Sequence, residues 1–319
     1  MTATPPVDGR TRHYGDFYGV GDATAGDDRP VLVVHGNCQA EAMRVVLETS
    51  THTFRCVRVP PVHELVAGDE PHLTRLLRTC AVLVSQPVRD GYHGLPLGTA
   101  EVAAAAPAAR LVLVPVVRDS RLHPYQALVR VDGAGEPPVV PYHDLRTLAL
   151  AARTAAPAGS ARGGAGASEA PRTAGRAGLL AVADRSRAEL RRREAAHGTL
   201  VVSDLLEAAG AEASHTLNHP GNPVLVGLVQ RVLDALGAGA TARDPGRVLL
   251  RSVLAPLHPE VLDALGLDPA RARPDWLVNG EPVTDRAVRE AQLAWYAEHP
   301  EVVTAGLARH ADAMRDLGL

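Results

Sequence analysis

The 319-residue sequence contains no lysine and no isoleucine, but it contains 33 arginines. The absence of lysine excludes mechanisms that need an ε-amino group, including Schiff-base formation, an internal aldimine with pyridoxal phosphate and phosphate binding by a P-loop lysine. Arginine, alanine, glycine and proline are all abundant, which is typical of a genome rich in guanine and cytosine. The missing lysines therefore carry no functional meaning beyond these exclusions.

Aromatic residues and cysteines are also scarce. Two tryptophans, six tyrosines and two phenylalanines are few for a surface that stacks bases or sugar rings. Three cysteines, Cys38, Cys56 and Cys80, are too few for a disulfide framework. The formal charge of −3 does not favour binding to nucleic acid or to an anionic membrane. We find no signal peptide and no apolar run of membrane-spanning length, and we expect a cytoplasmic protein with reduced thiols.

Short apolar runs alternate with helical patterns between residues 30 and 150. The runs predict buried strands at 31–35, 54–59, 81–85 and 110–116, and the helical patterns lie at 38–48, 71–79 and 97–106. This alternation predicts an α/β domain over residues 30–150, with an open parallel sheet, flanking helices and a flavodoxin-like or SGNH-like topology.

The rest of the chain divides by composition. Residues 1–29 are polar and rich in glycine, proline and aspartate, and we expect a flexible lead-in. Residues 151–178 are rich in alanine and glycine and nearly free of large apolar side chains, which predicts a flexible insertion. Helical patterns then predict that residues 179–245 complete the catalytic domain, and that residues 246–319 form a C-terminal helical extension.

The first strand passes into its helix at a cysteine. The strand ends at Gly36 and the helix begins at Cys38, so the positive end of the helix dipole faces that thiol. Such a position lowers the pKa of a thiol and favours a nucleophile. Asn37 and Gln39 offer side-chain donors, and the turn amides offer an oxyanion hole. The alternative interpretation is that Cys38 is a small residue filling a tight junction.

Four motifs in a fixed order resemble the WcbI-like family of polysaccharide biosynthesis enzymes. They are Gly36-Asn-Cys-Gln39 after the first strand, Ser85-Gln-Pro-Val88 at the end of the third strand, Pro141-Tyr-His-Asp144, and Thr216-Leu-Asn-His-Pro220 before an apolar helix. The resemblance covers about residues 31–236 and implies acetyl transfer from coenzyme A in capsule biosynthesis, with Cys38 as the central site residue. His35 and residues 117–124 depart from the family pattern.

A cysteine nucleophile needs a base or a cation that holds its thiolate. His219 is the first candidate because it lies in the last of these motifs, at an element boundary. His143 is the second, with Asp144 as an orienting carboxylate. Asp204 is a candidate third member of a triad, and fits equally well as an acidic residue at a helix start. For each histidine the competing interpretation is a structural or solvated side chain.

Coenzyme A carries phosphates, which only arginine can bind as a cationic side chain in a chain without lysine. Arg89, Arg118 and Arg121 follow the third and fourth predicted strands and are the candidate phosphate contacts, together with Gln86. His215 and His219 are four residues apart, but Pro220 interrupts the helix that such a metal pair would need, so we expect no metal.

The leading functional prediction is an acyltransferase that uses acetyl-coenzyme A to O-acetylate a polysaccharide precursor or glycoconjugate. Two alternatives remain open at this point. One is an SGNH-like cysteine esterase or thioesterase, because SGNH hydrolases carry a serine in the turn where Cys38 stands. The other is a non-catalytic module that binds coenzyme A or a nucleotide in a glycan-assembly system. The expected partners are an acyl-CoA donor and a hydroxyl acceptor, with no nucleic acid, and the C-terminal helices are a candidate surface for homo-oligomers.

Overall fold

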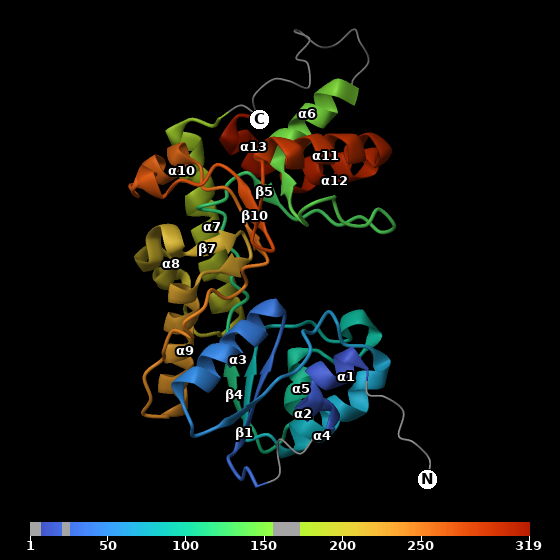
Figure 1. The fold of residues 1–319 in the computed structure, drawn as a ribbon, viewed down its shortest axis with the longest axis vertical. Coiled ribbons are helices and arrows are strands. Elements are labelled where there is room, and N and C mark those ends of the chain that lie inside the picture. Colours follow the sequence, from blue (N-terminus) through green and yellow to red (C-terminus); the bar gives the residue numbers. More distant parts are fainter. Residues whose placement is uncertain (1–7, 21–25, 156–172) are drawn as a thin grey trace. The chain divides into compact units, whose positions relative to one another are not determined.

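The computed structural model describes residues 8–20, 26–155 and 173–319. Contacts within the chain divide it into two compact units (Figure 1). Unit 1 comprises Met1–Val117, Arg191–Ala208 and Gly221–Leu250, and unit 2 comprises Arg118–Leu190, Ala209–Pro220 and Arg251–Leu319. Each unit thus gathers stretches that are separate in the sequence, whereas the segments expected from composition are contiguous.

Unit 1 is built on a four-stranded sheet with the order β2-β1-β3-β4, in which all neighbours are parallel. The strands are β1 (Val31–His35), β2 (Arg55–Val57), β3 (Val82–Ser85) and β4 (Arg110–Leu113). This confirms the predicted open parallel sheet. Because β1 and β3 are neighbours while β2 lies outside β1, the chain reverses its winding direction there, as in flavodoxin-like folds. Ligands of such sheets bind at the carboxyl ends of these two strands.

Helices cover both faces of this sheet. On one face α3 (Cys38–Ser50) packs against α9 (Asn222–Leu236), and on the other α4 (Glu70–Thr79) packs against α5 (Thr99–Ala105), as Figure 1 shows. Successive strand residues point to opposite faces, so Val33 and Leu83 join the core beneath α4 and α5. The predicted helices at 38–48, 71–79 and 97–106 are therefore confirmed to within a few residues.

Residues 9–18 correct the expectation of a flexible lead-in over residues 1–29. They form α1 (Gly9–His13) and α2 (Gly15–Tyr18), and Phe17 is fully buried in the core beneath α4. Arg10 Nη2 donates to Asp69 Oδ2 at 2.7 Å. Aromatic side chains, led by Phe17, and ion pairs with distant residues fix this segment, and a composition dominated by polar residues reveals neither.

The flexible insertion expected at residues 151–178 lies largely outside the described residues. Its first residues continue α6 (Leu145–Ala155), and its last ones begin α7 (Arg176–His197), which is followed by α8 (Ser203–Ala209). The helical patterns predicted at 179–197, 200–209 and 224–236 are confirmed. Short 3-10 helices lie at η2 (Ala67–Asp69), η3 (Tyr92–Gly94), η4 (Gly210–Glu212) and η5 (Pro269–Arg271).

The core of unit 2 forms where α6 packs against α11 (Asp285–Glu298) and α12 (Pro300–Arg309). Gly306 lets these helices pack closely, because a Cβ atom on it would lie 3.0 Å from Leu148 Cδ1, a tight contact to which Leu148 would have to adjust. The remaining helices are α10 (Pro259–Ala264) and α13 (Ala311–Leu317). Two short antiparallel pairs join β5 (Gln126–Ala127) to β6 (His143–Asp144), and β7 (Ser214–Thr216) to β8 (His219–Pro220).

The mainly helical C-terminal region is confirmed, but it also contains a small sheet that the sequence reading missed. The strands β9 (Val253–Leu254), β10 (Trp276–Val278) and β11 (Glu281–Val283) pair antiparallel in the order β11-β10-β9. Asn279 and Gly280 connect β10 to β11 with positive φ angles of 52° and 90°. An Asn-Gly pair between apolar residues is a strong hairpin signal, so this sheet was detectable from the sequence.

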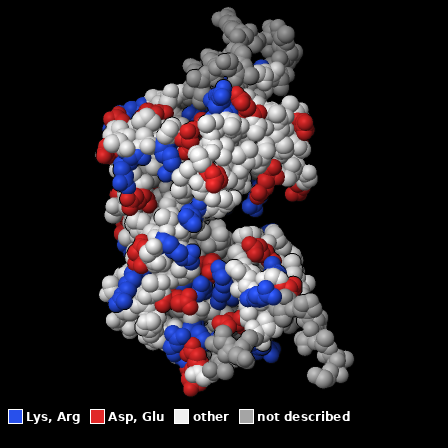
Figure 2. All heavy atoms as spheres, in the orientation of Figure 1, with Lys and Arg blue, Asp and Glu red and all other residues white. Residues whose placement is uncertain are grey.

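Charged side chains of both signs are interspersed over the face shown in Figure 2. This agrees with a formal charge close to zero. No helix among the described residues combines the length and the apolarity that crossing a membrane would require.

Candidate functional site

The turn that carries Cys38 lies at the carboxyl end of β1, where the winding of the sheet reverses. Asn37 caps α3, since its Oδ1 accepts a hydrogen bond from Gln39 N at 2.9 Å. Its carbonyl oxygen accepts a second bond from Ala40 N at 2.8 Å. An asparagine cap satisfies amides that the first helical turn would otherwise leave unpaired. The local sequence therefore fixes both the start of the helix and the position of the cysteine.

Two buried glutamines, Gln39 and Gln86, hold this turn; we call them the glutamine pair. Gln86 is 1% exposed and Gln39 is 2% exposed. Gln86 Oε1 accepts from Asn37 N at 2.9 Å, and Gln86 Nε2 donates to Gln39 Oε1 at 3.0 Å and to Pro115 O at 3.3 Å. Gln39 Nε2 donates to Val117 O at 2.8 Å, and Val117 N donates back to Gln39 Oε1 at 3.0 Å.

The glutamine pair joins the turn to the end of β3 and to the chain beyond β4. Because both amide groups are buried and hydrogen-bonded within the fold, the structure corrects two predictions. Gln39 does not present its side chain as an oxyanion donor, and Gln86 does not present its side chain to a cofactor. Sequence reasoning placed both residues at the right edge of the sheet but missed their positioning role, since nothing local signals a contact between residues 47 apart.

Gly36 is the residue that lets Gln86 approach the turn. A Cβ atom at position 36 would lie 2.3 Å from Gln86 Oε1 and 2.8 Å from Gln86 Cδ. Real Cβ contacts are never this short, so any larger residue displaces the Gln86 amide. The glycine predicted as part of the site is thus required for packing at the turn.

This contact predicts strong coupling between positions 36 and 86. We expect Gly36→Ala to destabilise the protein by about 2–3 kcal/mol, because it expels a buried amide from its hydrogen bonds. In a Gln86→Ala background the same change should cost about 1 kcal/mol or less, since the clash is gone. Urea denaturation of the four proteins of the cycle measures this coupling. Equal costs in both backgrounds would contradict it.

Cys38 is half-buried at the start of α3. Burial raises the pKa of its thiol above the usual value, while hydrogen bonds from the backbone N–H groups of Cys38 and Gln39 act in the opposite direction. The net direction corrects the prediction of a lowered pKa. The helix N-terminus does stabilise the thiolate, but the loss of solvent around the sulfur outweighs it. Cys56 and Cys80 are buried in the core, as predicted.

His35, whose orientation the sequence left open, is a buried residue of the sheet. Its Nε2 donates to Leu97 O at 2.9 Å, and the ring is 1% exposed. Burial lowers the pKa of this imidazole, so it stays neutral and has a structural partner.

His143 is occupied by structural bonds, which corrects its assignment as a candidate base. It lies in unit 2, where its Nδ1 is 2.6 Å from Tyr296 Oη and its Nε2 is 3.2 Å from Val129 O. Burial lowers the pKa of the ring to about 4. With both ring nitrogens bonded and the ring buried, His143 fixes the packing of α11 against the β5–β6 pair.

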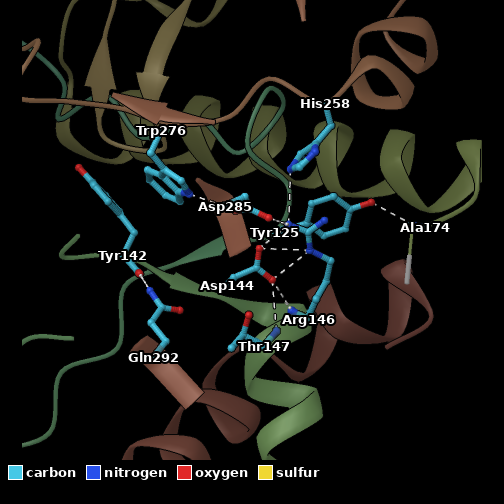
Figure 3. A network of polar contacts seen from close by, with 10 residues as sticks. All are labelled: Tyr125, Tyr142, Asp144, Arg146, Thr147, Ala174, His258, Trp276, Asp285 and Gln292. Atoms are coloured by element: carbon cyan, nitrogen blue, oxygen red, sulfur yellow. Dashed lines mark hydrogen bonds and ion pairs between the residues drawn. The ribbon is translucent and has the colours of Figure 1, made fainter. Parts of the chain in front are cut away.

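Asp144 does not orient His143, because adjacent residues of a strand point to opposite faces. Figure 3 shows it bound instead to Arg146, whose Nη2 lies 2.6 Å from Asp144 Oδ2. Arg146 is 6% exposed, and its guanidinium lies 4.1 Å from the centre of the Tyr125 ring. Burial alone raises the pKa of Asp144, but Arg146 brings it below the usual value. This ion pair is a structural element of unit 2.

Asp204 likewise has an arginine rather than a histidine as its partner. It lies in unit 1 at the start of α8, and Arg231 of α9 donates to both its carboxylate oxygens at 2.8 and 2.5 Å. Those bonds lower the pKa of Asp204. The alternative interpretation, an acidic residue at a helix start, is the one that the structure favours over a member of a triad.

His219 lies in β8 of unit 2, at the boundary before α9 where the sequence placed it. Its ring meets that of Tyr142 edge-on, with centroids 6.3 Å apart. Tyr142 Oη donates to Asn218 Oδ1 at 2.8 Å and accepts from Thr216 Oγ1 at 2.9 Å. The Thr216–Pro220 motif is therefore a hydrogen-bonded hairpin that presents His219. Because Cys38 belongs to unit 1, a role for His219 as base stays a prediction.

The three predicted phosphate-binding arginines differ in their surroundings. Arg89 is exposed in unit 1, with its guanidinium 5.9 Å from the Tyr92 ring centre. Arg121 is buried in unit 2 and its Nε donates to Asp119 Oδ2 at 2.9 Å, so its charge is already paired, which argues against a phosphate contact. Arg118 is exposed in unit 2 and remains a candidate.

Comparisons with known proteins agree with the motifs and the fold. The family model described as "Polysaccharide biosynthesis enzyme WcbI" matches residues 31–241, which include the Cys38 turn, Gln86 and His219. No curated protein matches the chain. A solved structure of WcbI, described as a novel polysaccharide biosynthesis enzyme, is similar with a TM-score of 0.72 and 18% identity, over 91% of this chain and 97% of that one. It is described as native protein without a disulfide bond between coenzyme A and a cysteine.

Proposed function

The chain belongs to the family of the polysaccharide biosynthesis enzyme WcbI, and we propose that it is an acyltransferase. It transfers an acetyl group from acetyl-coenzyme A to a hydroxyl group of a polysaccharide precursor or related glycoconjugate, such as a capsule component. The observation that carries the proposal is the placement of Cys38. It begins a helix at the carboxyl end of β1, where such sheets bind ligands, and the glutamine pair holds its turn rigidly.

In the covalent route the Cys38 sulfur attacks the acetyl carbonyl carbon. The bond from that carbon to the sulfur of coenzyme A breaks, and coenzyme A leaves with the proton that Cys38 gave up. The acceptor hydroxyl then attacks the Cys38 thioester and loses its proton to His219, the bond from the acetyl carbon to the Cys38 sulfur breaks, and the proton on His219 returns the leaving thiolate to the thiol. In the direct route His219 deprotonates the acceptor, and Cys38 only helps to stabilise the tetrahedral intermediate. Asn37 Oδ1 is used as the helix cap, which leaves its Nδ2 group to donate to the oxyanion.

Coenzyme A is the proposed donor for two reasons. The description of the similar solved structure relates coenzyme A to a cysteine of that protein, and Cys38 lies in the motif that carries the family resemblance. The three cysteines of this chain are free thiols, which fits a reducing compartment such as the cytoplasm.

Two competing functions have specific support. The flavodoxin-like strand order with a nucleophile after β1 fits an SGNH-like esterase or thioesterase equally well, with water as the acceptor. The burial that raises the pKa of Cys38 favours a non-catalytic module that only binds coenzyme A or a nucleotide.

Intact-protein mass after brief incubation with acetyl-coenzyme A separates these functions, with the release of coenzyme A followed in parallel. We expect the wild type to gain the mass of one acetyl group and Cys38→Ala to gain none. Release that depends on a glycan acceptor without an adduct would support the direct route. Release that needs no acceptor would favour the hydrolase, and binding without any release would favour the module.

A further inference from the structure

Three exposed arginines in unit 2 influence one another electrostatically although they come from three separate segments; we call them the arginine cluster. Arg118 begins the segment after β4, Arg130 lies between β5 and β6, and Arg309 is the last residue of α12. Arg118 was a candidate phosphate contact in the sequence, whereas Arg130 and Arg309 are recognisable only from the fold.

Packing around β5 and α12 positions two of these arginines. Val129 is buried in the core of unit 2 and Val131 packs against that core, whereas Arg130 between them is exposed. The chain at Val129 packs on α12 at Gly306, where a Cβ atom would lie 3.3 Å from Val129 Cγ2. One turn later, His310 hydrogen-bonds to the backbone of Leu128. Arg130 and Arg309 therefore flank the same contact.

Arg118 lies within electrostatic range of both other arginines. Partial desolvation of its guanidinium by neighbouring protein, followed by the positive charges of Arg309 and Arg130, lowers the pKa of Arg118 although the side chain keeps contact with solvent, and no carboxylate contributes. The segment that carries Arg118 is anchored next to it, because Asp119 N donates to Leu217 O at 2.7 Å. The three positive charges are thus held together by the backbone rather than by attraction between side chains.

Several other arginines of unit 2 have acidic partners. Arg121 pairs with Asp119, Arg146 with Asp144, and Arg185 with Asp316. Among the described residues, the arginine cluster has no such carboxylate within salt-bridge distance. Like charges that lie near one another without a counter-charge repel each other and destabilise the fold. An anionic ligand bound among them would relieve this repulsion.

We propose that the arginine cluster binds the phosphates of a diphosphate-bearing ligand, which under the proposed function is the coenzyme A donor. Guanidinium groups form forked, charge-assisted hydrogen bonds with phosphate oxygens, and three of them match the several phosphate charges of coenzyme A. The inference rests on the proposed function only for the choice of coenzyme A over a nucleoside diphosphate sugar. It also gives the C-terminal helices a part in ligand recognition through Arg309, which lies outside residues 31–241 of the family match.

Isothermal titration calorimetry with coenzyme A, pantetheine, ADP and inorganic pyrophosphate tests the arginine cluster. We expect Arg118→Gln, Arg130→Gln and Arg309→Gln each to weaken coenzyme A binding about tenfold, as the loss of one charged hydrogen-bonding group does. Binding of pantetheine, which has no phosphate, should not change. Arg286→Gln is the matched control, because Arg286 is an exposed arginine of α11 in the same unit. Circular dichroism melting curves confirm that the variants fold.

The outcomes separate this inference from the proposed function. Equal coenzyme A affinity in wild type and in the triple variant would overturn the arginine cluster and leave the acyltransferase proposal standing. Wild type that binds ADP or pyrophosphate but not coenzyme A, with a loss in the triple variant, would support the phosphate site and overturn coenzyme A as the ligand. Wild type that binds none of the phosphate ligands would overturn the site.

Discussion

Replacing Cys38 by alanine lowers acceptor-dependent release of coenzyme A from acetyl-coenzyme A by about a thousandfold or more by the covalent route of the proposed function, because the attacking atom is removed. The fold should survive, since Cys38 is only half-buried and the hydrogen bonds of the turn are made by Asn37 and the glutamine pair. Steady-state rates with a panel of glycan acceptors measure the loss.

The matched control is Cys80→Ala, which removes a thiol from the core beneath α4 and should keep the activity of the wild type. A Cys38→Ala protein that retains more than about a tenth of the wild-type rate would overturn the covalent route, since loss of a true nucleophile costs far more. The direct route or the tight-junction interpretation of Cys38 would then hold.

The pH dependence of the reaction follows from the raised pKa of Cys38. Burial places this pKa above its usual value, so at neutral pH the group is mostly the unreactive thiol. If the free thiolate attacks, the rate below that pKa should rise about tenfold per pH unit, because the thiolate fraction does. Single-turnover acetylation of Cys38 between pH 7 and 9 measures this slope. A flat profile would mean that a bound ligand or His219 supplies the missing stabilisation of the thiolate.

Replacing Arg146 by methionine destabilises the protein by about 3–5 kcal/mol, the usual cost of leaving one partner of a buried ion pair without its counter-charge. Methionine replaces the aliphatic part of the side chain, so the loss is mainly electrostatic. Arg146 is 6% exposed, is bonded to Asp144, lies 3.9 Å from Asp285 Oδ2, and stacks on Tyr125, as Figure 3 shows. Urea denaturation gives the free energy of unfolding.

Two further variants test the origin of this loss. Arg153→Met changes an exposed arginine of the same helix, and should alter stability by less than about 0.5 kcal/mol. Adding Asp144→Asn to Arg146→Met should recover part of the loss, because the unpaired Asp144 carboxylate is removed while an amide oxygen can still accept hydrogen bonds from Arg146 N and Thr147 N. A double variant that is less stable than the single one would show that packing, and not the unpaired carboxylate, sets the cost.

The loss caused by Arg146→Met should shrink as the pH falls. In the wild type, burial raises the pKa of Asp144 but Arg146 lowers it below the usual value, so the ion pair stabilises the fold above the unfolded pKa of about 3.9. That stabilisation disappears as the pH falls through the lower, folded pKa. In the variant only burial remains, and the Asp144 carboxyl takes up a proton at a higher pH. The difference in unfolding free energy is therefore largest near pH 7 and smaller near pH 4.

Much of the secondary structure of unit 1 was predictable because residues that are adjacent in the sequence determine it. Short runs rich in valine and leucine predicted three of the strands, because a parallel strand that is buried on both faces is apolar at nearly every position. The strand at 54–59 was predicted from a mixed pattern of apolar residues and arginines. The Gly36-Asn-Cys-Gln39 stretch predicted the turn and the helix start, because a glycine and an asparagine cap act within a few residues. The α/β class, the sheet and the position of Cys38 were thus readable from the sequence.

The partners of the polar side chains were decided by the tertiary structure alone. The sequence around His143 is compatible with a catalytic base, but its ring is hydrogen-bonded to Tyr296, 153 residues away. The sequence around Asp204 is compatible with a triad member, but its carboxylate is hydrogen-bonded to Arg231. The pKa of the Cys38 thiol also depends on distant residues. The start of the helix lowers this pKa through nearby backbone N–H groups, but burial by the rest of the fold raises it by more. A sequence determines which groups are present and where the backbone turns, but desolvation and hydrogen bonding depend on residues that only folding brings together.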